Sequence, residues 1–357
     1  MKKLYHLLIV LLLFTNLTYA QNLSRLWVNV HIDSSTDYHN LNDMAVDANG
    51  NTYLTGYEVD PGDEYYQTHL VLFKINAGGT FGWKRNFNNL KDSIDEAIAV
   101  ATDASGNVYV TGRRIDTFCN ICTYNTKISD VITIKYNAAG NQVWLNRYHD
   151  SIYKLVAPTD ISIAPNGTIL ITANERHYVS EIGTYVSSLV VQKIDINGNT
   201  IWVKKMKDVV GNAGCFDKNN NIVIAGASNP GGLLYQTQKP MVLKFTNAGS
   251  LLWSNVFNEY NKNGRLYYVG CDALNNIYVN GQTDTITFFN IPRIVTIKYN
   301  SAGQQQWFKK EVDRTYTLPH FYGDFKVDTS GNSYLAGYVN KSSVDDDWII
   351  KNTVIPV

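Results

Sequence analysis

The sequence predicts an all-β protein built from six copies of one four-stranded unit, and three observations lead to this prediction. A first block, which runs from an Asp or Ala to a Gly or Ala nine residues later, recurs six times without a gap. A second block, with a Gly five residues and a Trp nine residues after a Lys, recurs five times and begins a sixth time. The two blocks alternate over most of the 357 residues, so the internal period decides the fold class.

Both blocks have the pattern of a β-hairpin. Short apolar runs, such as the one at 108–110, flank Gly, Asn and Asp, which tolerate the turns that reverse a strand. One unit is therefore four short antiparallel strands, and such units repeated around an axis are the blades of a β-propeller. The first blocks begin at Asp47, Asp103, Ala164, Asp217, Asp272 and Asp328. The second blocks begin at Lys74, Lys135, Lys193, Lys244, Lys298 and Lys351.

The last copy predicts how the ring closes. Only six residues follow Lys351, so the sixth unit has no Trp-bearing strand after it. At the other end of the chain, Trp27 precedes Asp47 by twenty residues, the spacing that separates Trp83 from Asp103. We therefore expect the N-terminal strand to complete the last blade and close a six-bladed ring. The expected blade cores are 41–83, 97–144, 158–202, 212–253, 267–307 and 322–351 with 26–30.

The repeat also resembles a known family. Its Asp-x-x-Gly-Asn-x-Tyr-x-x-Gly block, followed by Lys-Tyr-Asn-x-x-Gly-x-x-x-Trp, is similar to the β-propeller repeat called SBBP, found in secreted and surface-associated bacterial proteins. The resemblance covers 27–351 and implies a propeller scaffold without a fixed activity. Two units depart from the pattern, which puts their turn geometry in question: Ala164 and Leu170 in the third, Asn220 and Val223 in the fourth.

Residues 1–20 have the pattern of a secretory signal peptide. A basic start and an apolar run over 4–14 precede small residues at Thr18 and Ala20. We therefore expect cleavage near Ala20 and a single domain over 21–357 that is secreted, periplasmic or on the cell surface. No later run is long enough to span a bilayer. The 31 basic residues balance 31 acidic ones, which gives no sign of a nucleic-acid partner. We expect a monomer without a cofactor.

Export permits disulfides, and the chain has four cysteines. Cys119 and Cys122 stand in the longest connection between the two blocks of a unit, so we expect a local disulfide there. Cys215 and Cys271 stand two residues and one residue before the aligned Asp of their units. Because side chains alternate along a strand, we expect these two to point to opposite faces and to be two buried free thiols.

The lengths of the connections indicate which rim binds. The reversals inside both blocks are short and uniform, whereas the connections between blocks vary in length and sequence. Variable loops on a rigid scaffold are the usual place for binding residues. We therefore expect a ligand at the rim of the long loops and at the mouth of the central channel. The candidate ligand-binding residues there are Tyr57, Arg113, Arg114, His177 and Tyr338, which are equally compatible with polar loop positions.

Three carboxylates stand four residues before the aligned position of the first block, in units 1, 3 and 6: Asp43, Asp160 and Asp324. If the inner strands converge on a channel, these side chains face one another and are candidate catalytic acids and bases, or cation ligands. A solvated face is the alternative interpretation. No histidine spacing predicts a metal site, and no nucleophile motif or phosphate-binding loop is present.

The repeated residues themselves predict structure. We expect each aligned Asp to cap its own turn, and the Lys and Trp of the second block to bind or pack between units. The function expected first is an exported, non-catalytic propeller that binds a protein or a glycan. The alternatives are a carbohydrate-active enzyme, lyase or glycosidase, that uses the three carboxylates, and a purely structural module of the envelope.

Overall fold

The computed structural model describes residues 39–59, 68–87, 93–116, 128–150, 155–179, 184–228, 238–258, 263–283, 293–311, 323–340 and 346–353. The expected leader, the strand 26–30, and the pair Cys119 and Cys122 lie outside the described residues. Among the residues described, no helix is long and apolar enough to cross a bilayer. The described chain is all-β.

The strands fall into consecutive antiparallel units, and we label the strands of each unit A to D in chain order. Unit 1 contains β1 (His39–Val46), β2 (Thr52–Val59), β3 (Thr68–Ile75) and β4 (Phe81–Phe87). Unit 2 contains β5 (Ser93–Thr102), β6 (Val108–Asp116), β7 (Ile128–Tyr136) and β8 (Gln142–Tyr148). Unit 3 contains β9 (Leu155–Ile163), β10 (Ile169–Val179), β11 (Thr184–Ile194) and β12 (Thr200–Lys207).

The remaining units follow the same order. Unit 4 contains β13 (Val209–Phe216), β14 (Ile222–Ser228), β15 (Lys239–Phe245) and β16 (Leu251–Val256). Unit 5 contains β17 (Gly264–Cys271), β18 (Ile277–Thr283), β19 (Arg293–Tyr299) and β20 (Gln305–Glu311). In unit 6 the described residues form β21 (Gly323–Val327), β22 (Ser333–Asn340) and β23 (Asp346–Thr353).

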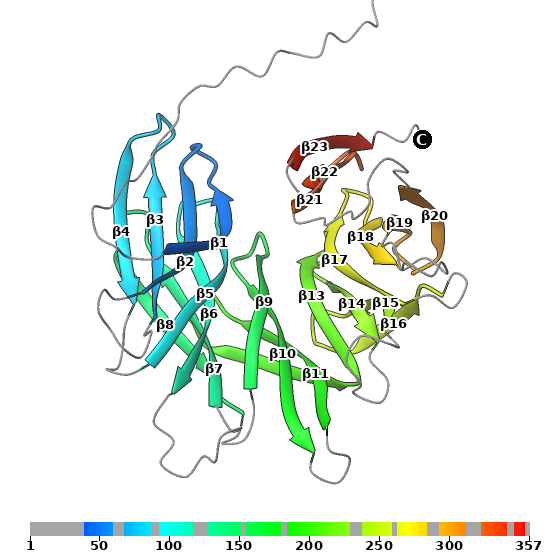
Figure 1. Ribbon diagram of the computed structural model, residues 1–357, viewed down its shortest axis with the longest axis horizontal. Helices are drawn as coiled ribbons and strands as arrows, with labels where there is room; N and C mark the ends of the chain where they lie inside the picture. The colour runs from blue at the N-terminus through cyan, green and yellow to red at the C-terminus, as the bar shows by residue number, and fades with distance from the viewer. Residues whose placement is uncertain are drawn as a thin grey trace, which may run out of the picture.

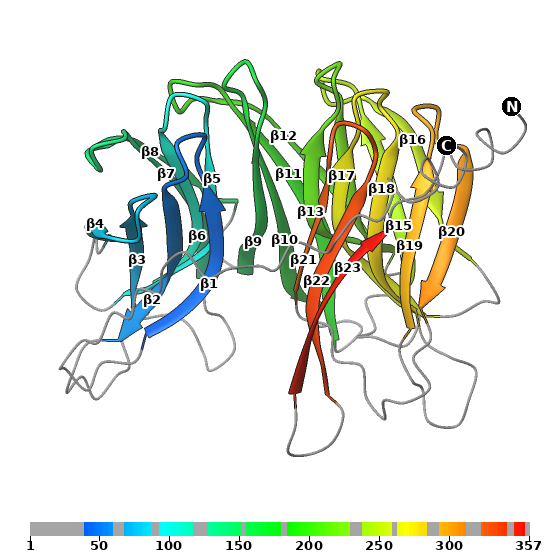
Figure 2. The same ribbon diagram turned by 90° about the horizontal axis from the view of Figure 1, so that it is seen from above.

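The units are arranged around an axis, with strand A innermost (Figure 1). Figure 2 shows the tight turns of the units gathered on one side of the molecule, the upper side in that view. We call this side the turn rim, and the side where strands B end and strands C begin the loop rim. Four-stranded antiparallel units placed side by side around an axis are the arrangement of a β-propeller.

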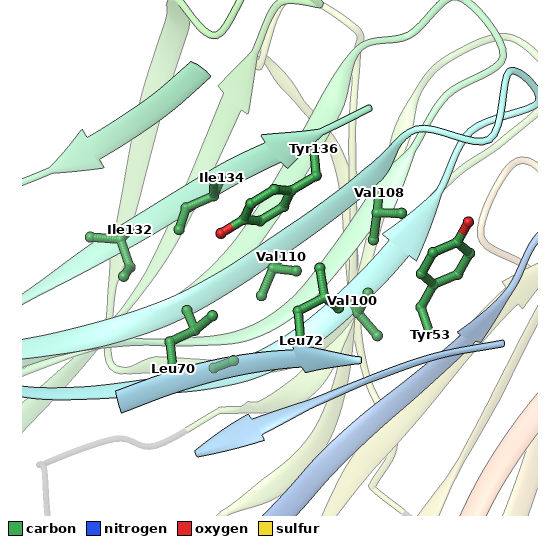
Figure 3. Packing of buried hydrophobic residues seen from close by; sticks show 10 residues of the cluster. Tyr53, Leu70, Leu72, Val100, Val108, Val110, Ile132, Ile134 and Tyr136 are labelled. Atoms are coloured by element: carbon green, nitrogen blue, oxygen red, sulfur yellow. The ribbon is translucent and has the colours of Figure 1, made fainter. Parts of the chain in front are cut away.

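The hydrophobic core lies between consecutive units. Each buried cluster of the described residues draws on two neighbouring units. In the first, Leu70 and Leu72 of β3 meet Val108 and Val110 of β6, as Figure 3 shows. A sheet that packs against the next sheet on each face needs apolar residues on both faces, and strands B and C are accordingly buried almost throughout.

The aligned Asp caps the A–B turn, as predicted. The backbone N–H groups of Ser105 and Asn107 both donate to Oδ1 of Asp103, at 2.9 Å. Its Oδ2 accepts from the Asn107 amide at 2.7 Å and from the Tyr109 hydroxyl at 3.0 Å. The Asp, Asn and Tyr of the motif therefore form one hydrogen-bond network, in which the capping carboxylate holds the Asn and the Tyr. The same network recurs at Asp47, Asp272 and Asp328.

The two units that depart from the motif keep the turn. In unit 3 the N–H of Gly167 donates to the carbonyl of Ala164 at 2.8 Å, the bond that Gly106 makes to Asp103 in unit 2. In unit 4, Asn220 takes the place of the Gly with φ 59°, a left-handed conformation that Asn tolerates.

In units 1, 3 and 4 both the Lys and the Trp of the second block bond to the next unit, again as predicted. In unit 3, Nζ of Lys193 and Nε1 of Trp202 donate to the Asn247 carbonyl in the C–D turn of unit 4, at 2.9 and 3.3 Å. The Trp ring lies against the Gly of that turn: a Cβ on Gly249 would come within 3.2 Å of it. The same docking joins units 1 to 2, 2 to 3 and 4 to 5, through Trp83, Trp144 and Trp253.

Candidate functional site

The inner strands surround a central cavity of about 940 Å³. Strand A of every unit contributes to its wall, from β1, β5, β9, β13, β17 and β21. The sequence predicted that the inner strands converge on a channel, and the cavity is that channel. It is the one place in the described structure where side chains of all units meet, so we treat it as the candidate site.

A bulge shapes the wall of the cavity. In each of units 1 to 5, strand A carries one extra residue, five positions before the aligned Asp or Ala. In three units that residue is polar and bonds to a carbonyl of the next unit. Asn42 donates to the Ala97 carbonyl at 2.6 Å and Thr159 to the Gly211 carbonyl at 3.1 Å. Asn212 donates to the Leu266 carbonyl at 2.6 Å. In these three units the bulge therefore turns one side chain toward the neighbouring inner strand.

Two of the three predicted carboxylates make a matching bond. Oδ2 of Asp43 accepts from the Val100 N–H at 2.8 Å, in unit 2. Oδ2 of Asp160 accepts from the Gly214 N–H at 2.8 Å, in unit 4. Each aspartate thus satisfies a backbone donor of the next inner strand that the sheet of that unit leaves open. These carboxylates have a structural role that the sequence did not predict.

The third carboxylate differs. The Asp324 side chain is 59% exposed, and its Oδ2 lies 3.0 Å from Nζ of Lys326. Its Oδ1 accepts from the Phe325 N–H at 2.7 Å, as Oδ1 of Asp160 does from Ile161 at 2.8 Å. All three aspartates line the same cavity. In the described part of the chain, however, no three acidic, histidine or cysteine side chains come close enough together to hold a metal ion.

Burial controls the charge of the cavity. The pKa of Asp160 is raised to about 7: burial is the main cause and the charge of Asp43 adds to it, while the N–H groups of Gly214 and Ile161 and the charge of Lys326 oppose the rise. Burial likewise raises the pKa of Asp43; the Val100 N–H and Lys326 oppose this effect, and the charge of Asp324 adds to it. The charge of Asp43 thus acts on Asp160, and the charge of Asp324 acts on Asp43. Protonating one of them relieves that repulsion.

The rest of the wall is uneven around the axis. The strand β1 exposes three apolar side chains, Leu41, Met44 and Val46. Across from it, Tyr267 and Tyr268 of unit 5 place their ring centroids 6.5 Å apart, and the first is 37% exposed. One wall thus offers aliphatic surface, and another offers aromatic rings close to an exposed carboxylate and an ammonium group. The sequence missed Tyr267, because no repeated pattern marks the bulge residue.

The predicted rim residues stand on strand B of four different units. Arg113 pairs with Glu96, with Nη2 and Oε2 2.8 Å apart. Arg114 is buried, with 3% of its side chain exposed, 4.0 Å from the fully buried Asp95. Tyr57 accepts a hydrogen bond from the Asn40 amide at 3.4 Å. His177 lies in β10 and Tyr338 in β22, and their side chains are outside what the structure describes.

Other ion pairs stand at the same ends of the strands. Asp130, almost fully buried, contacts both Arg147 and His149. Lys205 contacts Asp150 and, at 2.7 Å, Glu175. Arg147 and Lys205 stand at the same position of their units, three residues after the Trp, whereas no histidine stands at the position of His149 in the other units, so the period marks only part of these pairs. They place paired charges on strands B to D at the loop-rim ends of units 2 and 3.

The two cysteines of strand A do meet, contrary to the prediction. Both are free thiols, as predicted, but their sulfurs are 3.2 Å apart. Alternation along a strand does put the two aligned positions on opposite faces of a unit. It does not keep the two thiols apart, because they belong to neighbouring units. In a ring of stacked sheets, one face of a unit packs on the opposite face of the next, so residues on opposite faces are the ones that meet. Cys215 also lines the cavity.

Comparison with known proteins adds little on activity. No family model matches the chain, and no curated protein sequence matches it. Among solved structures it is similar to the β-propeller domain of the Trilobed protease from Pyrococcus furiosus, with 8% identity, a TM-score of 0.48, and 88% of this chain and 82% of that one covered.

Two further solved structures are similar at the same level. An endo-arabinase from Bacteroides thetaiotaomicron has 10% identity and a TM-score of 0.41, with 90% of this chain and 96% of that one covered. A protein of unknown function from Bacteroides caccae has 10% identity and a TM-score of 0.43, covering 76% and 82%. Such low identities do not indicate a shared activity.

Proposed function

We propose that this protein is an exported, non-catalytic β-propeller that binds a protein or a glycan through its loop rim and the adjoining mouth of the central cavity. The observation that supports this best is that the turn rim is regular, whereas the cavity wall is varied. The turn rim repeats the same bonds from unit to unit. The cavity wall shares a bulge between units but varies in its side chains, with aliphatic, aromatic, acidic and basic groups around one space.

A non-catalytic role agrees with how the carboxylates are used. Asp43 and Asp160 each accept a hydrogen bond from a backbone N–H of the next unit, so both have a structural role that needs no substrate. Tyr267 and the pair Asp324 and Lys326 are exposed aromatic and charged groups of the wall. An aromatic ring beside charged groups suits a sugar ring or an extended peptide, because both combine an apolar face with polar edges.

One observation favours a second candidate, a carbohydrate-active enzyme of the lyase or glycosidase class. Asp160, with its pKa raised to about 7, lies within electrostatic range of Asp43. Two carboxyl groups of different pKa are what general acid and base catalysis on a glycosidic bond requires. In that case Asp160→Asn abolishes turnover and leaves binding intact.

We further propose that the ring has six blades, that strand 26–30 completes the last one, and that the chain is a member of the SBBP-type propellers. Asp324 supports closure: it stands at the position of Asp43 and Asp160, and the unit that follows unit 6 around a closed ring is unit 1. Deleting 21–32 then destabilises the whole domain. A deletion variant that melts like the full mature chain contradicts the closure.

Export by a signal peptide is part of the same proposal. The mature chain, 21–357, is then secreted, periplasmic or surface-located, and monomeric. Mass spectrometry of the protein recovered outside the inner membrane tests this, since cleavage after Ala20 gives a defined N-terminus.

The decisive experiment on function uses the mature chain and a panel of polysaccharides and glycoproteins. Both retention on the immobilised panel and the appearance of new reducing or unsaturated ends are measured. Retention without new ends supports a binding protein. New ends that disappear in Asp160→Asn establish the enzyme instead. If the chain neither is retained nor produces new ends, the structural envelope module is the interpretation that stands.

A further inference from the structure

Two thiols face each other at the interface between units 4 and 5. Cys215 lies near the end of β13 and Cys271 at the end of β17, and their sulfurs are 3.2 Å apart. Both side chains are partly exposed and pack against the core cluster of this interface. Cys215 also forms part of the cavity wall.

We propose that Cys215 and Cys271 are an oxidation site, at which an external disulfide converts the two thiols into a disulfide bond between the inner strands of units 4 and 5. One thiol attacks the external disulfide and forms a mixed disulfide, releasing the first external thiol. The second protein thiol attacks that bond and releases the other external thiol. Two electrons and two protons thus pass from the protein to the external disulfide.

The geometry needs only a short movement. A disulfide bond is roughly 2.05 Å long, so from 3.2 Å the sulfurs approach by about 1.2 Å. The strands are already held side by side, because the amide of Asn212 in β13 donates to the Leu266 carbonyl in β17 at 2.6 Å. Their partner strands β14 and β18 contribute Val223 and Val279 to one core cluster. The interface therefore presents the thiols to each other before any oxidant arrives.

The order of the two attacks follows from access. Cys215 lines the cavity, so it meets the external disulfide first, and Cys271 resolves the mixed disulfide. Contact with the Cys271 thiol and burial both raise the pKa of Cys215. Because the thiolate is the attacking species, oxidation speeds up as the pH rises.

The disulfide bond would crosslink units 4 and 5 at their inner strands. It closes a loop between residues 56 positions apart and lies beside Asp160 and the rest of the cavity wall. A crosslink of that span limits the unfolded chain, and it holds units 4 and 5 together at the edge of the proposed binding site. This inference does not rest on the proposed function, because the chemistry needs only the two thiols and an oxidant.

The test uses the mature chain with Cys119→Ser and Cys122→Ser, so that no other cysteine remains. The protein is incubated with oxidised glutathione at pH 8 and at pH 9, alkylated, digested and mapped by mass spectrometry. We expect both thiols to become protected, with one crosslinked peptide pair, faster at pH 9. We also expect Tm to rise on the order of 5 °C and to return to its first value with a reductant.

Two matched variants complete the design. With Cys271→Ser, the mixed disulfide of Cys215 with glutathione should accumulate, because the resolving thiol is gone. With Cys215→Ser, glutathione should add to Cys271 at least tenfold more slowly. The proposal is overturned if the parent protein keeps both thiols open to alkylation, or if it retains glutathione on Cys215 while Cys271 stays reduced.

Discussion

Aspartate serves opposite purposes at the turn rim and in the central cavity. At the turn rim, Asp103 accepts four hydrogen bonds, and the amide, hydroxyl and N–H donors lower its pKa although burial opposes them. In the cavity, Asp160 accepts two N–H bonds, yet burial and the charge of Asp43 raise its pKa. The comparison teaches that the number of donors around a carboxylate, set against its burial, decides which charge state the fold favours.

The largest effect should come from the docking of units at the turn rim. Gly198 has φ +90°, and a Cβ there would lie 2.7 Å from the Trp144 ring. Gly198→Ala adds backbone strain and a clash, so we expect it to lower the free energy of unfolding by about 2–4 kcal/mol. Urea denaturation measures the loss.

A glycine in an equivalent turn provides the control. Gly78 has nothing within 4 Å of an added Cβ. Gly78→Ala should therefore change the stability by less than about 0.5 kcal/mol. If the two variants lose the same amount, the Trp144 ring does not dock on the turn, and the turn rim does not join the units.

The next effect distinguishes the cavity aspartate from the turn-rim aspartates by how the free energy of unfolding changes with pH. The folded pKa of Asp160, about 7, lies above its ordinary value of 3.8, so the folded state binds more protons between these values. Stability from this group is present at low pH and is lost as the pH rises toward 7. Asp160→Asn removes the titration, so its deficit against the parent protein should be smaller at pH 8 than at pH 5, by on the order of 2 kcal/mol.

For the turn-rim aspartates, the change of stability with pH has the opposite sign. Hydrogen bonds to Asn and backbone donors lower the pKa values of Asp103 and Asp47, so their contribution is present above pH 4 and is lost as the pH falls. Melting curves from pH 3 to 8 should thus show a steep acid decline that Asp160→Asn leaves unchanged. A deficit of Asp160→Asn that is constant with pH would mean that folding leaves the pKa of Asp160 at its ordinary value.

A smaller effect tests why the motif needs a carboxylate. Oδ2 of Asp103 accepts from both Asn107 and Tyr109, so an amide nitrogen in its place would face two donors. Asp103→Asn should cost about 1–2 kcal/mol. In the C–D turn of unit 3, Oδ2 of Asp195 is bonded to the Asn199 amide in place of such a pair.

Asp195→Asn is therefore the matched variant and should cost less. The equivalent C–D turn of unit 2 already uses Asn137, whose Oδ1 accepts the same two backbone donors. Equal losses for the two variants, measured by thermal melts at pH 7, would show that the Tyr hydroxyl contributes nothing to the A–B cap.

Residues that repeat could be predicted from the sequence, and residues that do not repeat could not. The Asp cap, the docking of Lys193 and Trp202, and the convergence of the inner strands all follow from the period. The contact of Cys215 with Cys271 was missed because it depends on how one unit faces the next. The burial of Arg114 was missed because it lies opposite the buried Asp95 of the neighbouring strand, and neither residue recurs in the other units.

The smallest effect concerns the loop rim and distinguishes binding from stability. Arg113 and Glu96 form a partly exposed ion pair, with 38% and 17% of the side chains exposed. Arg113→Ala should cost less than about 1 kcal/mol of stability, since an exposed pair contributes little. If the loop rim binds the ligand, the same variant should weaken retention of a bound glycan or protein several-fold. Glu96→Gln keeps Arg113 and serves as the control. Equal retention by Arg113→Ala and the parent protein would move the ligand away from Arg113 and toward the cavity wall of units 5 and 6, where Tyr267→Ala is the next variant to measure.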